Sequence, residues 1–222
     1  MPSERFYKLS AEKQERIHQA AMREFCSVPM EEVSINRIVR EAGISRGSFY
    51  TYFRDKQDVL HYLMKDARAR EIAYVKACVE KTSGDFWKTA QLVLHYELEF
   101  FGRWNFFDSS RNLAIRSGFN PFDSVRRRKL DAGNETKDAC KEACSGQEEE
   151  EDEVLVDWLM KHVDLSRFRT PSREVLRALT LQCRVLMMIT IAKILLIPER
   201  EKEALRTYEE MMTIFKEGVM KR

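Results

Sequence analysis

Residues 34–53 read SINRIVREAGISRGSFYTYF, and this stretch decides the fold of the N-terminal part of the chain. A serine precedes each of two short segments, and a serine in that position can accept a hydrogen bond from the free amides of a helix's first turn. The pattern predicts one helix over 35–42 and a second from Ser45 to about Tyr52. Gly43 can adopt the left-handed conformation that ends the first helix. Two helices joined in this way form a helix-turn-helix, whose second helix can enter the major groove of DNA.

The second of these helices has a polar face that suits the reading of DNA. Gly47 carries no side chain there, so the helix could approach a duplex closely. Arg37 and Lys56 are placed to meet phosphates, and Lys56 opens a long helix whose free amides also attract an anion. The candidate DNA-facing residues of the second helix are Ser45, Arg46, Gly47, Ser48, Tyr50 and Thr51. The same spacing also fits an ordinary helical hairpin with Phe49, Tyr52 and Phe53 in the core, so spacing alone leaves both alternatives open. Phe49 and Phe53, four residues apart, are expected in the core.

The longer run AGISRGSFYTYFRDKQDVL, residues 42–60, resembles the signature of TetR-family transcriptional regulators. The shared features are the aromatic pairs Phe49-Tyr50 and Tyr52-Phe53 and the lysine that opens the next helix, Lys56. With the upstream segments 17–25 and 33–42, the resemblance covers about a quarter of the chain.

The sequence departs from the family pattern at three places. Val39 stands where alanine is usual, Ser48 where threonine is common, and Pro29-Met30 in a turn that often contains glycine. None of these departures removes a DNA-facing group.

The resemblance implies a homodimer in which each subunit places one helix-turn-helix in half of a roughly palindromic operator on double-stranded DNA. It also implies repression that is relieved when a small-molecule effector binds the C-terminal domain. In the family, positions that match Arg46, Ser48, Tyr50 and Thr51 contact bases or nearby phosphates. Positions that match Ser34, Arg37, Tyr52 and Lys56 hold the DNA backbone.

The charge of the chain is sorted along its length. The 222 residues carry 38 basic and 36 acidic side chains, a formal net charge of +2. Residues 133–153 hold nine acids and two bases, a local charge of −7, so the other residues carry +9. Residues 33–56 carry +3. This excludes a polybasic tail or an acidic disordered protein and leaves nucleic-acid binding open.

Composition favours an all-α fold, because only 8 glycines and 5 prolines stand beside many helix-forming residues. We expect a helix-turn-helix DNA-binding domain over 1–55 and a helical ligand-binding and dimerisation domain over 56–222, with 56–80 as the connecting helix. Residues 133–150 are expected to form a mobile loop that could include a helical turn. The other expected helices are 11–27, 85–104, 106–115, 121–130, 151–162, 172–197 with Pro171 at or near its first turn, and 198–218. Ser10 is the expected N-cap of the helix 11–27, and Asp55 that of the helix from 56.

The last two helices are apolar on most sides, so they must be buried on most sides. Two such pairs can form a four-helix interface between subunits, with burial in a monomer core as the alternative. The expected dimer residues are Leu176, Leu179, Leu186, Ile189, Thr190, Ile194, Met211, Ile214 and Phe215.

A second group of aromatic and methionine side chains could line a cavity for a small, largely apolar molecule. Ordinary core packing is the alternative for each of them. The group comprises Tyr96, Phe100, Phe101, Trp104, Trp158, Met187 and Met188. A bound molecule could act by tilting the helix 56–80, since the spacing of the two DNA-binding domains must match a groove repeat of about 34–36 Å.

The sequence predicts no metal, no cofactor and no membrane contact. Its 5 cysteines lack the spacing of a disulfide framework and its N-terminus has no signal segment, so we expect free thiols and a cytoplasmic location. Cys26, Cys78 and Cys183 are expected in the core, while Cys140 and Cys144 make an incomplete metal site. The longest apolar run, 185–197, is too short to cross a bilayer. A helical-bundle enzyme and a helical scaffold without DNA binding are the rival function classes.

Overall fold

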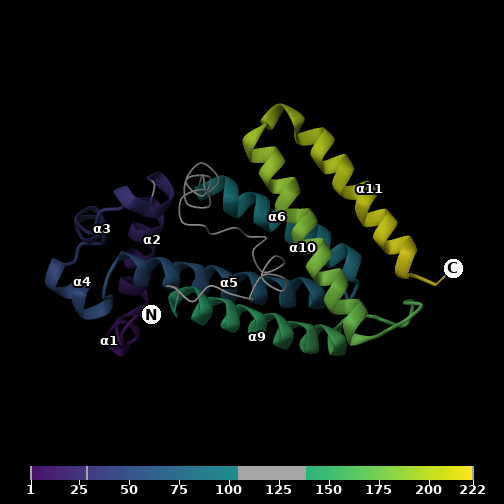
Figure 1. Cartoon of the computed structure of the whole chain (residues 1–222), viewed down its shortest axis with the longest axis horizontal. Helices are drawn as coiled ribbons and strands as arrows, with labels where there is room; N and C mark the ends of the chain where they lie inside the picture. The colour runs from purple at the N-terminus through teal and green to yellow at the C-terminus, as the bar shows by residue number, and fades with distance from the viewer. Residues whose placement is uncertain (1, 29, 105–138, 222) are drawn as a thin grey trace, which may run out of the picture. The chain divides into compact units, whose positions relative to one another are not determined.

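The structure is a computed structural model that describes residues 2–28, 30–104 and 139–221, with side chains except at 103–104 and 139–149. Within these ranges every regular element is helical, and a single isolated bridge joins Phe168 to Met220. The all-α prediction is therefore confirmed. The elements in Figure 1 are α1 (Glu4–Tyr7), α2 (Ala11–Ser27), the 3-10 turn η1 (Met30–Glu32), α3 (Ile35–Ala42), α4 (Arg46–Tyr52), α5 (Lys56–Lys81), α6 (Phe86–Trp104), α9 (Ala139–His162), α10 (Arg173–Leu196), the 3-10 turn η3 (Pro198–Arg200) and α11 (Glu201–Val219).

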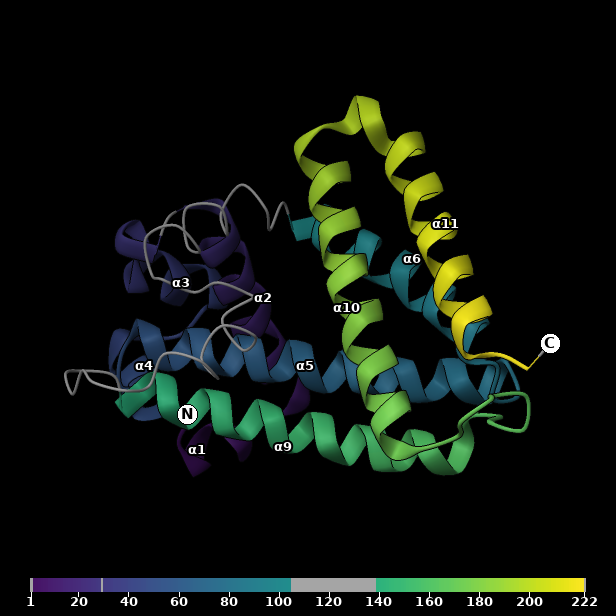
Figure 2. The ribbon, with the colours of Figure 1, turned by 45° about the vertical axis from the view of Figure 1, so that its right-hand side comes forward.

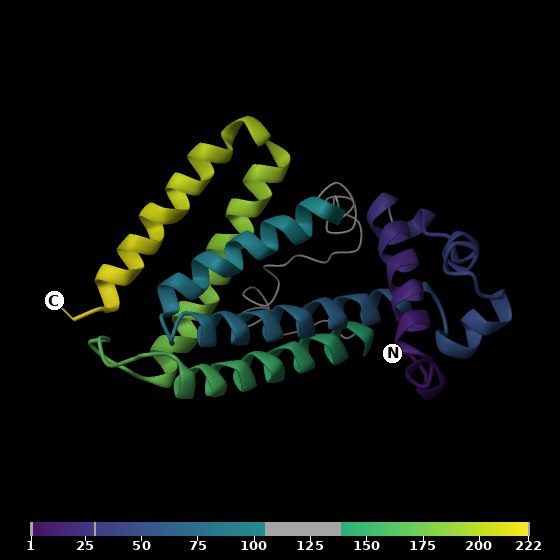
Figure 3. The same cartoon turned by 180° about the vertical axis from the view of Figure 1, so that it is seen from behind.

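The described residues form two compact units, residues 2–70 and residues 71–102 with 139–221, and α5 continues from the first into the second. In the first unit, α1 to α4 gather around the first turns of α5 (Figure 3). In the second, α10 packs against both α9 and α11, and α10 and α11 form an antiparallel hairpin (Figure 2).

The caps that define the first helices lie where the sequence predicts them. The Ser10 hydroxyl accepts from the Lys13 amide at 3.4 Å, and the Ser45 hydroxyl accepts from the Ser48 amide at 3.0 Å. Gly43 has φ 66°, the left-handed conformation that ends α3. Ser34 stands at the N-cap of α3, but its side chain makes no capping hydrogen bond.

Helix α1 has no counterpart in the sequence prediction. Its Phe6 is fully buried, with its ring centroid 5.2 Å from that of Phe53 and 5.0 Å from that of Tyr62. Ser3 donates from its amide to the Tyr52 carbonyl at 2.8 Å and from its hydroxyl to the Thr51 carbonyl at 2.7 Å. Since the last carbonyls of a helix have no partner within it, α1 both closes the core of this unit and caps the end of α4.

The turn between α5 and α6 requires glycine at position 84. Gly84 has φ +81°, and a Cβ there would lie 2.6 Å from the His162 carbonyl oxygen. The Asp164 amide donates to the Gly84 carbonyl at 2.9 Å. Close backbone approach thus joins this turn to the end of α9.

Two expected boundaries in the second unit are wrong. Residues 139–150, expected as a loop, are the first half of α9, because their alanines, glutamates and glutamine favour a helix even without an apolar stripe. Pro198 opens a 3-10 turn, and the last α-helix begins at Glu201. Ser172 caps α10, and Pro171 directly precedes this cap, near the first turn as expected. The expected helices 106–115 and 121–130 lie outside the described residues.

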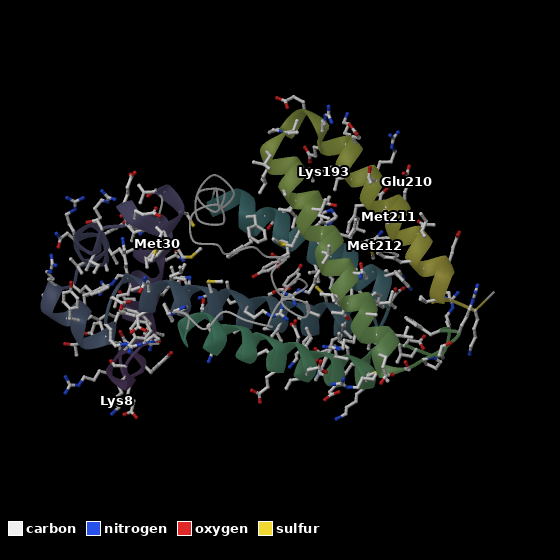
Figure 4. The ribbon with its side chains drawn as sticks, in the orientation of Figure 1. Lys8, Met30, Lys193, Glu210, Met211 and Met212 are labelled. Carbon is white, nitrogen blue, oxygen red and sulfur yellow. The ribbon has the colours of Figure 1, made fainter. Side chains whose placement is uncertain are left out.

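The expected core cysteines are buried, which confirms the prediction for Cys26, Cys78 and Cys183. Burial raises the pKa of the Cys26 thiol to about 11 and that of Cys183 to about 12. The Cys183 sulfur of α10 lies 3.7 Å from the sulfur of Met212, which is labelled on α11 in Figure 4. The Cys26 and Cys183 thiols stay protonated near neutral pH and act as small apolar side chains. The side chains of Cys140 and Cys144 lie outside the described ones.

Candidate nucleic-acid interface

The exposed face of α4 presents Arg46 in a fixed orientation. One Arg46 Nη atom donates to Asn36 Oδ1 at 2.7 Å and the other to the Tyr50 hydroxyl at 3.3 Å. The guanidinium carbon also lies 5.6 Å from the centroid of the Tyr50 ring. Arg46 and Tyr50 are expected site residues that the structure brings together. Asn36 of α3 was missed, because its contact with α4 has no signature in the local sequence.

The hydroxyls beside Arg46 have local partners. The Ser45 and Ser48 hydroxyl oxygens lie 2.9 Å apart, and Thr51 Oγ1 donates to the Gly47 carbonyl at 3.0 Å. A Cβ at Gly47 would meet only Ser45 Oγ, at 3.8 Å. The described atoms therefore leave room for a side chain at this exposed position. A requirement for glycine would arise only when another molecule approaches α4.

Two cations hold the turn between α2 and α3. Lys56 Nζ donates to the Met30 carbonyl at 2.7 Å and to the Glu31 carbonyl at 3.1 Å, and Arg37 Nη2 donates to the Glu32 carbonyl at 2.8 Å. Met30 is labelled in Figure 4. Three successive carbonyls of η1 thus accept from the two side chains that the sequence assigns to phosphates. An ammonium has three donors, and these contacts use two of those of Lys56.

Arg37 and Ser34 converge on a buried carboxylate that the sequence did not single out. Glu24 of α2 is 5% exposed. It accepts from the Ser34 amide at 2.7 Å and from Arg37 Nε at 2.9 Å and 2.8 Å, one distance to each carboxylate oxygen. The apolar spacing of α2 places position 24 beside core residues, so no sequence pattern marks it as a partner of α3.

Tyr52 belongs to the core of the first unit. It is 9% exposed, and its ring centroid lies 6.1 Å from that of Phe6. Phe49 and Phe53 are buried as well, which confirms the expectation that this pair is core. The resemblance implies that Tyr52 contacts the DNA backbone, but its side chain is packed in the core of the first unit.

The corner between α4 and α5 also contains a buried acid. Asp58 is 3% exposed and accepts from the Arg54 amide at 3.0 Å. Burial alone would raise the pKa of Asp58, but hydrogen bonds, among them those of Arg54, lower it to about 2. The Asp55 carboxylate accepts from the Asp58 amide at 2.8 Å, which confirms Asp55 as the cap of α5.

The expected dimer residues divide into two groups in the second unit. Leu176, Leu179, Thr190 and Ile194 are buried within the unit. Ile189 and Ile214 are 40% and 59% exposed, and Leu186, Met211 and Phe215 are half-buried. Further exposed apolar side chains of this hairpin and its corner are Leu181, Leu196 and Ile197.

Helix α10 is long and apolar enough to cross a membrane by length and composition, although only 33% of its most apolar 18-residue window is buried. The expectation that the apolar run is too short overlooked the residues that precede Val185. Arg184, in the middle of this helix, has one Nη atom 2.9 Å from both Asp152 oxygens of α9. An ion pair at this depth is costly in a bilayer, whereas it is ordinary in a helical bundle at the protein surface.

The expected effector residues form two aromatic groups. Tyr96 stacks on Tyr74 at 4.1 Å between ring centroids, and Phe100 continues the row at 6.5 Å from Tyr96. Phe101 packs edge-on against Phe100 at 5.5 Å. All four are half-buried.

The second group surrounds Trp158. Its ring stacks on His162 at 3.8 Å, with Lys76 Nζ 5.4 Å from its centroid. Met187 is buried and Met188 is half-buried. The side chain of Trp104 lies outside the described ones.

The comparisons with known proteins agree with the helix-turn-helix. The family model of bacterial regulatory proteins, tetR family, matches residues 17–63, which run from α2 into α5. Over 89 residues the chain is 30% identical to HTH-type transcriptional regulators of Staphylococcus aureus strains USA300 and N315. These alignments cover 40% of this chain and 48% of each relative, so the chain spans about half the length of the curated relatives it matches.

One solved structure extends the likeness to the fold. A tetR family transcription regulator from Shewanella sp. PV-4 aligns over 95% of this chain and 99% of its own, with a TM-score of 0.51 and 16% identity. A TetR family transcriptional regulator from Chloroflexus aurantiacus J-10-FL aligns over 100% of both chains with a TM-score of 0.46 and 21% identity. The family model and the curated relatives match the part of the chain that contains the helix-turn-helix. Residues 17–63 thus carry the N-terminal domain of the tetR family of bacterial regulatory proteins.

Proposed function

We propose that the protein is a homodimeric repressor of transcription that binds a palindromic operator and leaves it when a small, largely apolar molecule binds the second unit. The observation that carries the proposal is the polar face of α4, where Arg46 is held by Asn36 and Tyr50 inside the segment that matches the family. An exposed arginine whose guanidinium is held in one orientation suits bidentate contact with guanine in the major groove.

The proposed DNA surface comprises the face of α4 and the amino-terminal end of α5. The hydroxyls of Ser45, Ser48 and Thr51, exposed at Ser45 and half-buried at the other two, supply further polar groups, and the absence of a side chain at Gly47 allows close approach. Ser34, Arg37, Tyr52 and Lys56 were assigned to the DNA backbone through the resemblance. Of these, the proposal retains Lys56 most directly, since one of its three donors remains for a phosphate beside the free amides of α5.

The proposed dimer contact is the outer face of the α10–α11 hairpin. Ile189 and Ile214 leave apolar area exposed there, and Met211 (labelled in Figure 4) and Phe215 lie on the same helix as Ile214. A second copy is the occupant that satisfies this face, because two self-complementary helix pairs form a closed four-helix contact. The buried residues Leu176, Leu179, Thr190 and Ile194 support the hairpin from inside the subunit.

The proposed effector is planar and largely apolar. The stacked rings of Tyr74, Tyr96 and Phe100 offer half-buried aromatic faces on α5 and α6. Because α5 continues into the DNA-binding unit, a ligand that binds two orientations of α5 with different affinity would shift the spacing of the two DNA-binding units. A soluble, cytoplasmic location follows from this proposal.

Selection from random double-stranded DNA with the full-length chain tests the proposal. We expect enrichment of a palindrome whose half-sites are about 34–36 Å apart or a multiple of that distance. The Arg46→Ala variant should lose the enriched sequence, while an Arg5→Ala variant in α1 should retain it. Failure of the wild-type chain to enrich any sequence would overturn the proposal.

A further inference from the structure

We propose that Glu24 is a positioning residue of the DNA-binding domain, which fixes the start of α3 and the Arg37 guanidinium and thereby sets the pose in which α4 meets DNA. This inference rests on the proposed function and concerns a residue outside the DNA-reading face. Its basis is a hydrogen-bond network between α2 and α3.

Glu24 supplies one half of a capping box for α3, the half that accepts from the N-cap amide. In a capping box, a Glu or Gln at the third helical position accepts from the amide of the N-cap residue. The third helical position of α3 is Arg37, which cannot accept. The carboxylate that accepts from the Ser34 amide, at 2.7 Å, comes instead from Glu24 of α2. This half of the capping box thus joins two helices, and it holds the start of α3 against α2.

The burial of the Glu24 carboxylate makes its hydrogen bonds and its ion pair necessary. Glu24 is 5% exposed, and a buried carboxylate is retained at low cost only when its charge and its lone pairs are satisfied. Arg37 supplies the charge: its Nε lies 2.8 Å and 2.9 Å from the two Glu24 oxygens and its Nη2 lies 2.7 Å from one of them. The same Nη2 donates to the Glu32 carbonyl at 2.8 Å. The planar guanidinium of Arg37 in α3 therefore contacts both α2 and η1 and joins the three elements.

The pose of α4 depends on this junction. α3 leads directly into α4 through Gly43, and Asn36, which directly precedes Arg37, holds Arg46 at 2.7 Å. A change in the angle between α2 and α3 would move both Asn36 and the helix that Arg46 opens. Arg37 accordingly acts through Glu24 on the geometry of the domain, in place of the DNA-backbone contact that the resemblance implies.

Conservative substitutions separate positioning from phosphate contact. Glu24→Gln retains an acceptor oxygen for Ser34 but removes the charge, and Arg37→Lys retains a charge for phosphate but removes the fork. The exposed pair Arg23–Glu41 joins the same two helices, so Glu41→Gln is the matched control. The affinity of each variant is measured for the DNA selected by the wild-type chain and for unrelated DNA over a salt series, below the unfolding temperature of each variant.

We expect Glu24→Gln and Arg37→Lys each to weaken binding to the selected DNA about tenfold, and the double variant to be no weaker, because the two side chains form one network. The dependence on salt and the affinity for unrelated DNA should stay as in wild type, and Glu41→Gln should change neither. A wild-type affinity for Arg37→Lys, with a salt slope lowered by about one in Arg37→Ala, would identify a phosphate contact and overturn the proposal.

Hydrogen exchange of the Ser34 amide in the free protein provides a measurement without DNA. Glu24→Gln should accelerate exchange at Ser34 and in the first turn of α3, and Glu41→Gln should not. Unchanged exchange in Glu24→Gln would overturn the positioning role. A wild-type chain that selects no DNA would instead refute the proposed function, and the exchange data would still decide whether Glu24 holds α3.

Discussion

The His18 imidazole of α2 has its Nδ1 3.6 Å from Asp66 Oδ2 of α5, and this buried nitrogen has no hydrogen-bond partner among the described atoms. Tyr62 stands edge-on to the imidazole, with 5.8 Å between ring centroids. Arg70 forms an ion pair with the same carboxylate, and its Nε lies 2.6 Å from Asp66 Oδ2. Burial lowers the pKa of His18 and Arg70 adds to that shift, against the opposing carboxylates of Asp66 and Glu15. His18 is therefore a buried imidazole that the fold holds neutral.

Acidification should destabilise the DNA-binding unit through His18. Because its pKa is lower in the folded than in the unfolded state, the unfolded chain binds the proton first. The contribution of neutral His18 to stability is complete above its pKa in the unfolded chain, about 6.5. Below that pH the free energy of unfolding falls by at most about 1.4 kcal/mol for each pH unit. Urea unfolding at several pH values should show this loss in wild type and a smaller one in His18→Gln. Equal losses in both proteins would assign the effect to other groups.

The sequence predicts the parts of the domain that depend on neighbours along the chain. The caps at Ser10, Ser45 and Asp55 and the left-handed Gly43 are local features, and each lies where the pattern predicts it. Phe49 and Phe53 are four residues apart on α4 and the next position of the chain, so their burial also follows from helical spacing.

What the sequence could not predict depends on contacts between segments. The four residues of α1 are too few for a periodic pattern, and their helix is stabilised by Phe6 packing on Phe53 and Tyr62. Glu24 looks like one charged residue on an amphipathic helix until α3 brings Ser34 and Arg37 to it. Asn36 likewise acquires its role only from the position of Arg46.

Removal of Arg46 should relax the discrimination of one base pair. Arg46→Ala is expected to cost about 1–3 kcal/mol for the preferred base and little for the other bases at that position. Asn36→Ala should give a smaller effect at the same base pair, because the Tyr50 contact remains. Affinities for a set of operators with single substitutions measure both effects. A uniform loss across the set would show that Arg46 does not read a base.

Lys56→Ala should weaken binding to all DNA sequences alike. A phosphate contact by the remaining donor predicts that the salt slope falls by about one unit. Lys8, labelled in Figure 4, is an exposed lysine of the same unit and provides the control substitution Lys8→Ala. A lower affinity with an unchanged salt slope would leave Lys56 only the role of holding the Met30 and Glu31 carbonyls.

A charge on the outer face of the α10–α11 hairpin should separate the subunits. Ile189→Glu and Ile214→Glu place a carboxylate on exposed positions, so the fold should lose about 0.5 kcal/mol or less while light scattering at micromolar concentration reports a monomer. Val154→Glu on α9, also at an exposed position, is the control and should remain dimeric. Leu176→Ala, fully buried, should cost about 2–5 kcal/mol of stability. A wild-type chain that is already monomeric would contradict the proposed dimer.

The acidic segment, residues 133–153, should stabilise the second unit through an ion pair near its carboxyl-terminal end. Glu153 pairs with two arginines of α10, at 2.5 Å from Arg173 Nη2 and 2.7 Å from Arg177 Nε. Deletion of 133–153 would therefore remove helix α9 residues along with the charge, and a point substitution is the cleaner probe. Glu153→Gln should lower the free energy of unfolding by about 1 kcal/mol or less, since all three side chains are partly exposed.

Salt distinguishes this charge effect from a packing effect. At about 1 M salt the screening length is about 3 Å, so the difference between Glu153→Gln and wild type should vanish. Glu150→Gln, at an exposed position one turn earlier on α9, should change stability at neither salt concentration. Operator affinity should be unchanged in both variants, because Glu153 pairs with arginines of its own unit. A weaker operator complex in Glu153→Gln, with unchanged stability, would mean that the acidic segment acts on DNA binding directly.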